Sequence, residues 1–218
     1  MRTYFVSGVD TDAGKTYVTA RLAAQLRKEG VDVITQKPVQ TGCTTVAEDL
    51  EVHRQVMGCG MLPDDEAGLT CSYLFLKPAS PALAARLEGK KIDPDKIAAD
   101  TAELTHRHEI VLSEGAGGLM VPLTDDLLAI DYVAQHKLPL ILVTTSKLGG
   151  INHALLSIEA CKTHGVDLRM VVFNRLPGDE DVMADDSLME ISKFTKRIFP
   201  EAQIVDFRGQ ESFAGIRL

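Results

Sequence analysis

The stretch Gly8-Val9-Asp10-Thr11-Asp12-Ala13-Gly14-Lys15-Thr16 decides the fold that we expect for this chain. It fits the pattern G-x-x-x-x-G-K-[ST] of a phosphate-binding P-loop. The β-prone residues 3–7 precede it, and residues 16–29 place apolar side chains on one helical face. A strand, a glycine-rich loop and a helix in this order direct backbone N–H groups and a helix N-terminus at one point. The stretch therefore predicts nucleotide phosphate binding, with Lys15 near the phosphates and Thr16 as a ligand of Mg²⁺.

The composition fits one domain over residues 1–218. Of the 218 residues, 45% are apolar and 25% are charged, so we expect a sizeable core with a solvated surface. The net charge of −8 argues against a general nucleic-acid binder, and no apolar run approaches the length of a membrane span. The four cysteines share no C-x-x-C spacing, so neither a zinc site nor a redox pair is indicated. We therefore expect a cytoplasmic protein with free thiols that binds neither nucleic acid nor membrane.

Strand and helix patterns alternate along the chain. The strand candidates are residues 3–7, 31–35, 110–113, 140–144, 170–173 and 204–205, and the helix candidates are 16–29, 81–88, 94–106, 127–136, 151–164 and 183–196. The strands are nearly continuous apolar runs, which is typical of a parallel sheet covered on both faces. The pattern thus predicts an α/β, P-loop NTPase-like fold, a mostly parallel sheet flanked by helices on both faces. Residues 58–68 are expected to form a surface loop, and His106 and His108 are expected at the surface.

Polar residues follow the predicted strands at the edge where an open parallel sheet binds its ligands. Lys37 follows the second strand, Glu114 the third and Asn174 the fifth, while the P-loop follows the first. Lys37 could stabilise charge on a transferring phosphoryl group or hold an anionic acceptor. Glu114 is favoured as a Mg²⁺ ligand over a helix-capping carboxylate. The spacing leaves Asp49 open, because it could equally be an acid in the first turn of a helix.

Several further stretches resemble the dethiobiotin synthetase family. Besides residues 9–16 they are Lys37-Pro38-Val39-Gln40-Thr41-Gly42, Ser80-Pro81, Glu114-Gly115-Ala116-Gly117-Gly118, Leu148-Gly149-Gly150-Ile151-Asn152-His153 and Asn174, in family order over about residues 1–175. The resemblance implies an ATP- and Mg²⁺-dependent ligase of biotin biosynthesis that forms C–N bonds. One amine of 7,8-diaminononanoate takes up CO₂, the carbamate attacks the γ-phosphorus of ATP, and the second amine closes the ring to dethiobiotin with release of ADP and phosphate. It also implies a homodimer with sites near the subunit interface.

The resemblance assigns roles to the matching positions. The implied catalytic residues are Lys37, Lys15 and Thr11. The implied substrate-binding residues are Thr41 near the carbamate and Gly149, Gly150, Ile151 and Asn152, which open a helix toward the partner subunit's substrate carboxylate. The implied nucleotide-binding residues are Asp12, Ala13, Gly14, Lys15, Thr16, Tyr17, Asp49, Glu114, Gly115, Ala116, Gly117, Asn174 and Arg175, with Asn174 meeting adenine. Thr16, Asp49 and Glu114 are the implied Mg²⁺ ligands.

Two departures from the family pattern matter. Ala82 stands where the family commonly has His after Ser-Pro, and residues 204–209 lack the proline turn beside adenine. The second departure leads us to expect relaxed selectivity for the nucleotide base.

Two other functions remain open from the sequence. A nucleotide switch related to ParA or MinD would share the general fold, but it would carry an extra Lys early in the P-loop, where residues 9–13 are Val, Asp, Thr, Asp and Ala. A small-molecule kinase would share the P-loop and would not need CO₂.

Overall fold

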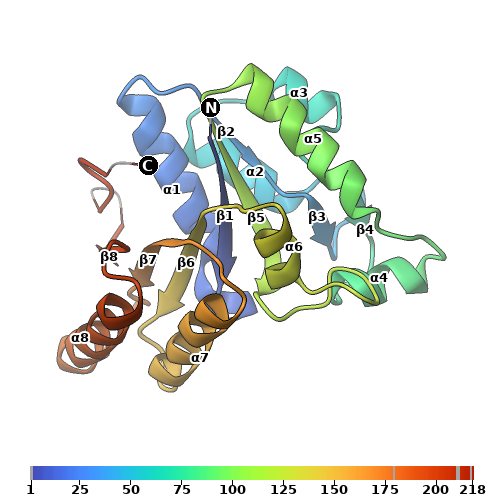
Figure 1. The fold of residues 1–218 in the computed structure, drawn as a ribbon. Helices are drawn as coiled ribbons and strands as arrows, with labels where there is room; N and C mark the ends of the chain where they lie inside the picture. Colours follow the sequence, from blue (N-terminus) through green and yellow to red (C-terminus); the bar gives the residue numbers. More distant parts are fainter. Residues whose placement is uncertain (1, 179, 210–211, 217) are drawn as a thin grey trace.

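A six-stranded sheet forms the centre of the computed structural model, which describes residues 2–178, 180–209, 212–216 and 218. Its strands are β1 (Arg2–Gly8), β2 (Val33–Gln36), β5 (Ile110–Gly118), β6 (Leu140–Thr145), β7 (Leu168–Asn174) and β8 (Gln203–Phe207). Their order is β2-β5-β1-β6-β7-β8, and each neighbouring pair in the described chain is parallel. All carboxyl ends therefore meet at one edge, which Figure 1 shows by the arrowheads.

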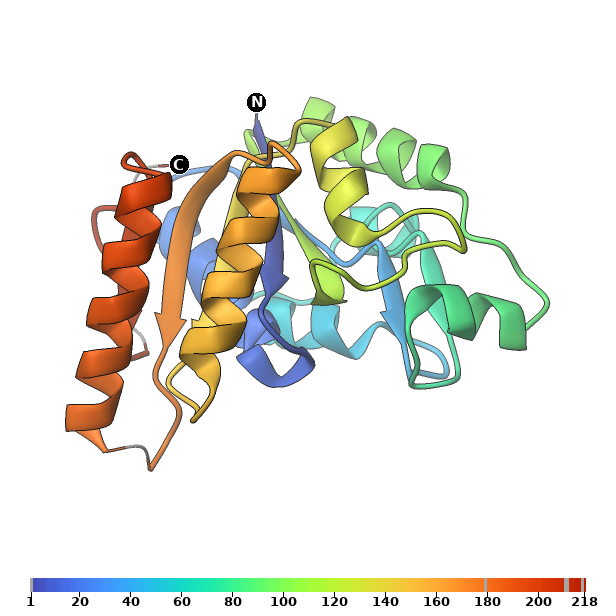
Figure 2. The same ribbon diagram turned by 60° about the horizontal axis from the view of Figure 1, so that its bottom comes forward.

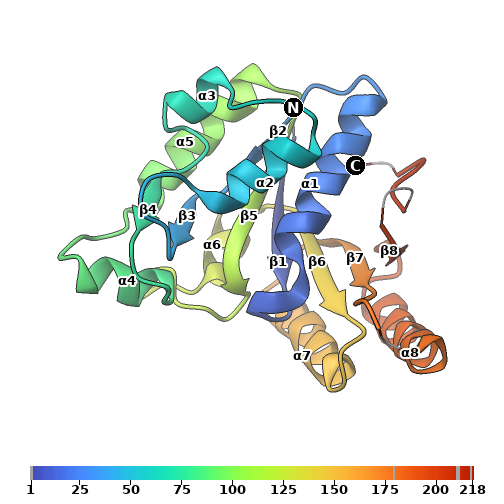
Figure 3. The same cartoon turned by 180° about the vertical axis from the view of Figure 1, so that it is seen from behind.

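Helices cover both faces of this sheet. The helices are α1 (Lys15–Lys28), α2 (Glu48–Val56), α3 (Pro63–Glu66), α4 (Pro81–Leu87), α5 (Pro94–Arg107), α6 (Ala129–Gln135), α7 (Gly150–Thr163) and α8 (Asp181–Ile198). Figure 2 shows α7 and α8 side by side on one face, and Figure 3 shows α1 and α2 together on the other. The fold class predicted from the apolar strands is thus confirmed.

Successive residues of the central strand reach the two separate cores. In β1, Tyr4 and Val6 pack into the core that contains residues of α1, whereas Phe5 packs into the core that contains residues of α6. The ring of Phe5 lies 6.5 Å from that of Tyr132. Because adjacent strand residues point to opposite faces, a strand buried on both faces needs the unbroken apolar run that the sequence displays.

The same alternation selects the face on which the polar groups gather. Val6 lies in register with Glu114 of β5, so the two side chains share the α1 face. The sequence pattern ends the third strand at residue 113, but β5 continues to Gly118. Glu114 therefore lies inside a strand, where it pairs with Val6 of β1.

A second, two-stranded sheet is not predicted by the sequence pattern. It consists of β3 (Val39–Thr41) and β4 (Tyr73–Phe75), which pair in parallel beside the main sheet. In Figure 1 this pair lies near α4 at one side of the molecule. The pair carries Thr41 at its carboxyl end.

The loop expected over residues 58–68 is wrong in its middle, because residues 63–66 form α3. Asp65 of this helix accepts hydrogen bonds from Arg54 Nε at 2.8 Å and Nη2 at 2.7 Å. The expectation for His108 is also wrong. It is half-buried, with Nδ1 2.8 Å from Asp32 Oδ1 and Nε2 3.0 Å from Asp64 Oδ2. His106 is exposed, as predicted.

Among the described residues, none of the helices combines the length and apolarity needed to cross a membrane.

Candidate active site

The P-loop leaves the first turn of α1 open for an anion. Gly14 precedes this helix with a left-handed φ of 85°, and no side chain caps the helix N-terminus. The first N–H groups of the helix are therefore without a side-chain acceptor. A Cβ on Gly14 would collide with Asn174 Nδ2, so both the backbone conformation and the space require glycine.

Four segments bring a compact charged cluster to the edge beside the P-loop. Lys37 Nζ lies 2.6 Å from Asp49 Oδ2 and 2.8 Å from Glu114 Oε1. It also donates to Gly115 O at 3.1 Å. Thr16 Oγ1 lies 3.1 Å from Asp49 Oδ1 and 3.0 Å from Glu114 Oε1. The structure thus brings together Thr16, Lys37 and Glu114, which follow three different strands in the sequence. Asp49, whose role the sequence left open, joins them.

The cluster is electrostatically coupled and largely withdrawn from water. Glu114 is fully buried and Lys37 is 4% exposed. Burial alone would raise the pKa of Glu114, but the Lys37 ammonium and the hydrogen bond from His53 hold it well below its usual range. Burial also acts to lower the pKa of Lys37, and Glu114 and Asp49 more than offset this, so that its pKa is raised. Both groups therefore remain charged at neutral pH.

Lys15 lies against the loop itself. Its Nζ donates to Asp10 O at 3.0 Å and to Thr11 O at 3.1 Å. Burial and the nearby Lys37 charge lower the pKa of Lys15 to about 8. Thr11, which the resemblance implied as catalytic, is exposed and contacts Lys15 through its carbonyl.

The oxygen atoms around Thr16 suit a hard cation. A hydroxyl has one hydrogen, so Thr16 donates to only one of Asp49 and Glu114 at a time. The other close pair of oxygens then has no hydrogen between them, an arrangement that Mg²⁺ would stabilise. Within the described residues no three His, Cys, Asp or Glu side chains form a metal group of their own. A metal here would draw its further ligands from phosphate oxygens and water, as in P-loop NTPases.

Helix α2 supplies two buried polar residues that the sequence analysis missed. His53 Nε2 lies 3.0 Å from Glu114 Oε2, the oxygen that does not contact Lys37, and His53 is fully buried. Arg54 donates to Thr35 Oγ1 at 2.7 Å and pairs with Asp65. Asp49 lies in the first turn of this helix, which confirms that position for it, and its contacts with Thr16 and Lys37 leave a functional role compatible with it. The four-residue spacing from Asp49 to His53 was the available signal, once a helix is assigned to residues 48–56.

Three residues expected to bind the nucleotide, Asn174, Arg175 and Tyr17, separate into two groups. Asn174 Nδ2 donates to Ala13 O at 3.0 Å, which places it directly against the P-loop. Arg175 instead pairs with Asp206 at 2.7 Å and with Asp185 at 2.6 Å. Tyr17 is exposed and meets the ring of Phe207 edge-on at 5.8 Å. The described structure gives Arg175 and Tyr17 protein partners and no contact with the charged cluster.

The residues expected to hold the substrate lie on separate elements. Gly149 precedes α7 with a φ of 89° and no side chain caps that helix, so its N-terminus resembles that of α1. Thr41 ends β3 and is half-buried. No hydrogen bond in the described chain links Thr41 or residues 149–152 to the charged cluster. Ala82 is buried near the start of α4 and donates its N–H to Pro122 O at 3.3 Å.

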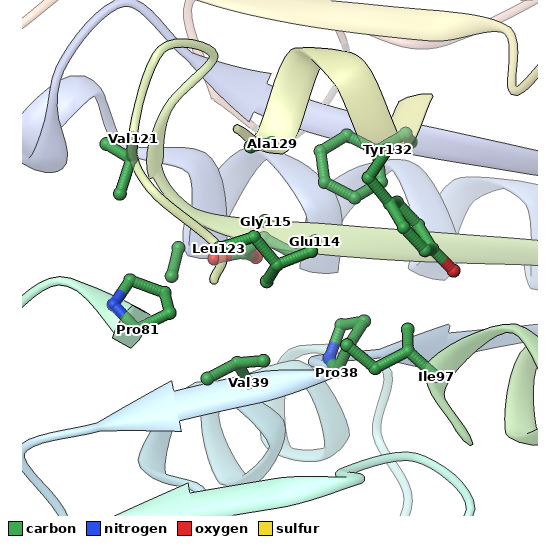
Figure 4. Close-up of a pocket in the computed structure, with 12 residues that line it drawn as sticks. Pro38, Val39, Pro81, Ile97, Glu114, Gly115, Val121, Leu123, Ala129 and Tyr132 are labelled. Atoms are coloured by element: carbon green, nitrogen blue, oxygen red, sulfur yellow. The ribbon is translucent and has the colours of Figure 1, made fainter. Parts of the chain in front are cut away.

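An apolar pocket adjoins the cluster on the opposite face of β5 (Figure 4). Val39 borders it on one side and Tyr132 on the other, with Gly115 of β5 between them. A Cβ on Gly115 would come within 2.8 Å of the Phe5 ring, so the close packing of Phe5 against β5 requires glycine here. Glu114 lines this pocket as well, and Gly115 O accepts from Lys37, so the pocket and the cluster share these two residues.

The fold and the P-loop cluster define a P-loop nucleotide-binding protein. A family model described as "AAA domain" matches residues 2–204. Among solved structures, a ParA family ATPase from Chlorobium tepidum has a TM-score of 0.55 at 13% identity, covering 97% of this chain and 87% of that one. The signal recognition particle receptor FtsY from Elizabethkingia anophelis, solved with GDP, has a TM-score of 0.56 at 16% identity, covering 99% and 64%. At such identities these two structures show the fold alone.

Curated relatives narrow the class to one family. The ATP-dependent dethiobiotin synthetase of Haemophilus ducreyi is 43% identical over 92% of this chain and 95% of its own length. That of Haemophilus influenzae is 49% identical over 79% and 91%, and that of Chlorobaculum tepidum is 45% identical over 92% and 84%. The chain belongs to the dethiobiotin synthetase family, which confirms the resemblance seen in its motifs.

Proposed function

We propose that this protein is an ATP-dependent dethiobiotin synthetase, which joins CO₂ to 7,8-diaminononanoate and closes the ureido ring. One observation carries the proposal beyond family membership. Beside the P-loop, Lys37 and Thr16 each lie within hydrogen-bond distance of both carboxylates, those of Asp49 and Glu114. Phosphoryl transfer needs little more from a protein than positioned charges of this kind.

Each part of the cluster has a role in this reaction. The N–H groups of residues 12–16 and the Lys15 ammonium hold the phosphates of ATP. Lys37 stabilises the negative charge that develops while the carbamate oxygen attacks the γ-phosphorus. The second amine then attacks the carbamic-phosphoric anhydride, and phosphate leaves as the ring closes. Thr11 and Thr41 are proposed to orient the carbamate.

Thr16, Asp49 and Glu114 are the residues proposed to hold Mg²⁺. When bound, the metal neutralises charge on the β- and γ-phosphates. The buried position of Glu114 and its lowered pKa keep one ligand ionised throughout. Lys37 contacts Asp49 and Glu114, the two carboxylates proposed to bind Mg²⁺. The ammonium group proposed to stabilise the transferring phosphoryl group is therefore held by the proposed metal ligands.

The remaining assignments concern the organic substrate and the assembly. The apolar pocket beside Gly115 is proposed to receive part of the hydrocarbon chain of 7,8-diaminononanoate, because its lining is apolar apart from Glu114. The uncapped N-terminus of α7, with residues 149–152, is proposed to receive the tail carboxylate of a substrate held by the partner subunit of a homodimer. Asn174 is proposed to meet the base, since it already lies on the P-loop.

We also propose that the chain is one domain and works in the cytoplasm, where its four free cysteines stay reduced.

Phosphate release with each component omitted in turn tests the proposed function. We expect full-rate release only when diaminononanoate, bicarbonate, Mg²⁺ and ATP are all present. ADP formed at the full rate without bicarbonate, with the phosphoryl group retained on the diamine and no free phosphate, would instead identify a small-molecule kinase. Equal rates without the diamine would identify an ATPase of the switch type, and either result would refute the proposal.

A further inference from the structure

His53 occupies the buried end of the charged cluster, where the proposed reaction leaves it without a role. Its side chain is fully buried, and Nε2 lies 3.0 Å from Glu114 Oε2. An ionised carboxylate can only accept hydrogen bonds, so Nε2 must carry the hydrogen and donate it. The Lys37 ammonium, 2.8 Å from Oε1, favours the ionised carboxylate.

The other ring nitrogen gives a reason to doubt that His53 serves packing alone. Nδ1 is buried and has no hydrogen-bond partner among the described residues. A buried polar atom without a partner costs free energy that an apolar side chain of similar size would not incur. An apolar residue would fill this space without that cost. We therefore infer that the hydrogen bond from Nε2 to Glu114 offsets the cost of burying Nδ1.

That contact fixes which oxygen of Glu114 faces the site. Oε2 accepts from His53, while Oε1 lies 3.0 Å from Thr16 Oγ1 and 2.8 Å from Lys37 Nζ. Without a donor on Oε2, the carboxylate plane could turn partway about its last bond and move Oε1 away from Thr16 and Lys37. His53 thus contacts the cluster only through Glu114 Oε2, whereas Thr16 and Lys37 contact Oε1.

The helix that carries His53 is itself firmly placed. Arg54, the next residue, donates to Thr35 Oγ1 at 2.7 Å and Thr35 O at 3.2 Å on β2, and pairs with Asp65 at 2.7 Å. Figure 3 shows α2 beside α1 on this face of the sheet. One turn before His53, the same helix carries Asp49. This anchored helix therefore positions both carboxylates of the cluster, Asp49 directly and Glu114 through the hydrogen bond from His53.

We propose that His53 is a positioning residue that holds Glu114 so that Oε1 faces Thr16 and Lys37. The proposal rests on the assignment of Glu114 to Mg²⁺ in the proposed function. Residues that orient the ligands of a metal in this way typically contribute about 10- to 100-fold in metal affinity or activity.

The test compares variants that differ in the donor at Nε2. His53→Gln keeps an N–H donor at a similar reach, and His53→Leu removes it while filling the space. We would measure binding of Mn²⁺ together with ADP by electron paramagnetic resonance, along with kcat and KM for the diamine. His53→Leu should weaken Mn²⁺ binding and lower kcat by about 10- to 100-fold with little change in KM. His53→Gln should recover most of both losses.

Two controls separate positioning from stability. Leu50→Ala creates a packing defect on the same helix, because Leu50 is buried, and its side chain has no polar atom to offer Glu114. It should lower the melting temperature while leaving Mn²⁺ binding unchanged. Where His53→Leu is too unstable to assay, His53→Asn provides a polar replacement whose amide reaches the Nδ1 position and not the Nε2 position. It is expected to show the same binding defect.

Glu114→Gln distinguishes failure of this inference from failure of the metal assignment. If Glu114→Gln binds Mn²⁺ as the wild type does, the metal role of Glu114 is wrong, and the inference falls with it. If Glu114→Gln loses Mn²⁺ while folded His53→Leu or His53→Asn retains it, only the role of His53 is refuted. A His53→Gln protein as defective as His53→Leu would also refute it, since the Nε2 donor would then not matter.

Discussion

Replacing Lys37 by Ala removes the cation shared by both carboxylates of the site. Its Nζ lies 2.6 Å from Asp49 Oδ2 and 2.8 Å from Glu114 Oε1, and the side chain of Asp49 remains 24% exposed whereas that of Glu114 is fully buried. Removing one partner of a buried pair costs about 3–5 kcal/mol of folding free energy. Because solvent can compensate Asp49 but not Glu114, we expect Lys37→Ala to be destabilised toward the lower end of that range.

The effect on catalysis should exceed the effect on nucleotide binding. A preorganised donor directed at charge that develops in the transition state is worth about 2.7–4 kcal/mol, or about 10²- to 10³-fold in kcat. An ammonium has three N–H donors, and the three acceptors that Lys37 contacts are all protein groups. A substrate oxygen would therefore replace one of them as charge develops, and ground-state ATP affinity should change by less than about tenfold.

The assay is phosphate release with saturating diamine, bicarbonate, Mg²⁺ and ATP, together with calorimetric ATP binding and urea unfolding. Lys96→Ala is the matched control, because Lys96 is half-exposed and its ion pair is with Asp100, which lies on its own helix outside the cluster. Activity is measured where unfolding shows each variant to be folded. A kcat within about threefold of wild type would refute the assignment. A loss of ATP binding as large as the loss of kcat would refute the claim that Lys37 acts chiefly in the transition state.

Three further predictions follow from the same structure. Lys15→Ala should weaken ATP binding by about 10- to 100-fold by calorimetry and lower turnover as well, because Lys15 faces ground-state phosphates; unchanged affinity would contradict this. Burial acts to lower the pKa of His108, but hydrogen bonds with Asp32 and Asp64 raise it above the unfolded value. The stability it contributes, no more than about 1 kcal/mol, should thus be complete below about pH 6 and be lost as pH rises through the folded pKa. Urea unfolding of wild type and His108→Gln should converge at high pH, and a gap that widens with pH would have the wrong sign. Asn174 Nδ2 donates one of its two hydrogens to the P-loop, which leaves one N–H and Oδ1, a donor and an acceptor that adenine and cytosine can both match. CTP should therefore support a kcat within about tenfold of ATP, about 1.4 kcal/mol, whereas a thousandfold preference for ATP in kcat would show that other groups read the base.

Local pattern and sheet topology account for the parts of the site that could be predicted from the sequence. A P-loop is a contiguous motif, and parallel strands bring their carboxyl ends to one edge whatever their order. The sequence alone therefore suffices to place Lys37 and Glu114 at the same edge. Their separation of 2.8 Å does not follow in this way, since it depends on how far β5 continues and on which face each side chain takes.

Helix α2 shows why the remainder was missed. The buried residues of this helix are Leu50, His53 and Arg54, and Met57 directly after it is also buried. These four positions have the three- and four-residue spacing of one helical face. Two of these four are polar, however, so a search for apolar periodicity finds no helix. Their burial is tolerated only because Glu114 and other residues distant in sequence satisfy them.

The β3–β4 pair and Arg175 illustrate a second limit. Strands of three residues, such as Val39–Thr41, carry too little pattern to be distinguished from loop. They form here because a partner strand distant in the sequence lies alongside. The partners of Arg175 on β8 and α8 are likewise set by the tertiary arrangement, which no local motif encodes.

Transfer of isotopically labelled bicarbonate into product tests the central claim most directly. With ATP, Mg²⁺ and 7,8-diaminononanoate, the protein should form a cyclic urea whose carbonyl carbon carries the label, with one ADP and one phosphate for each ring closed. ADP formed without labelled product, or a phosphorylated diamine in its place, would contradict the account that the Lys37–Glu114 cluster serves carbamate activation and ring closure.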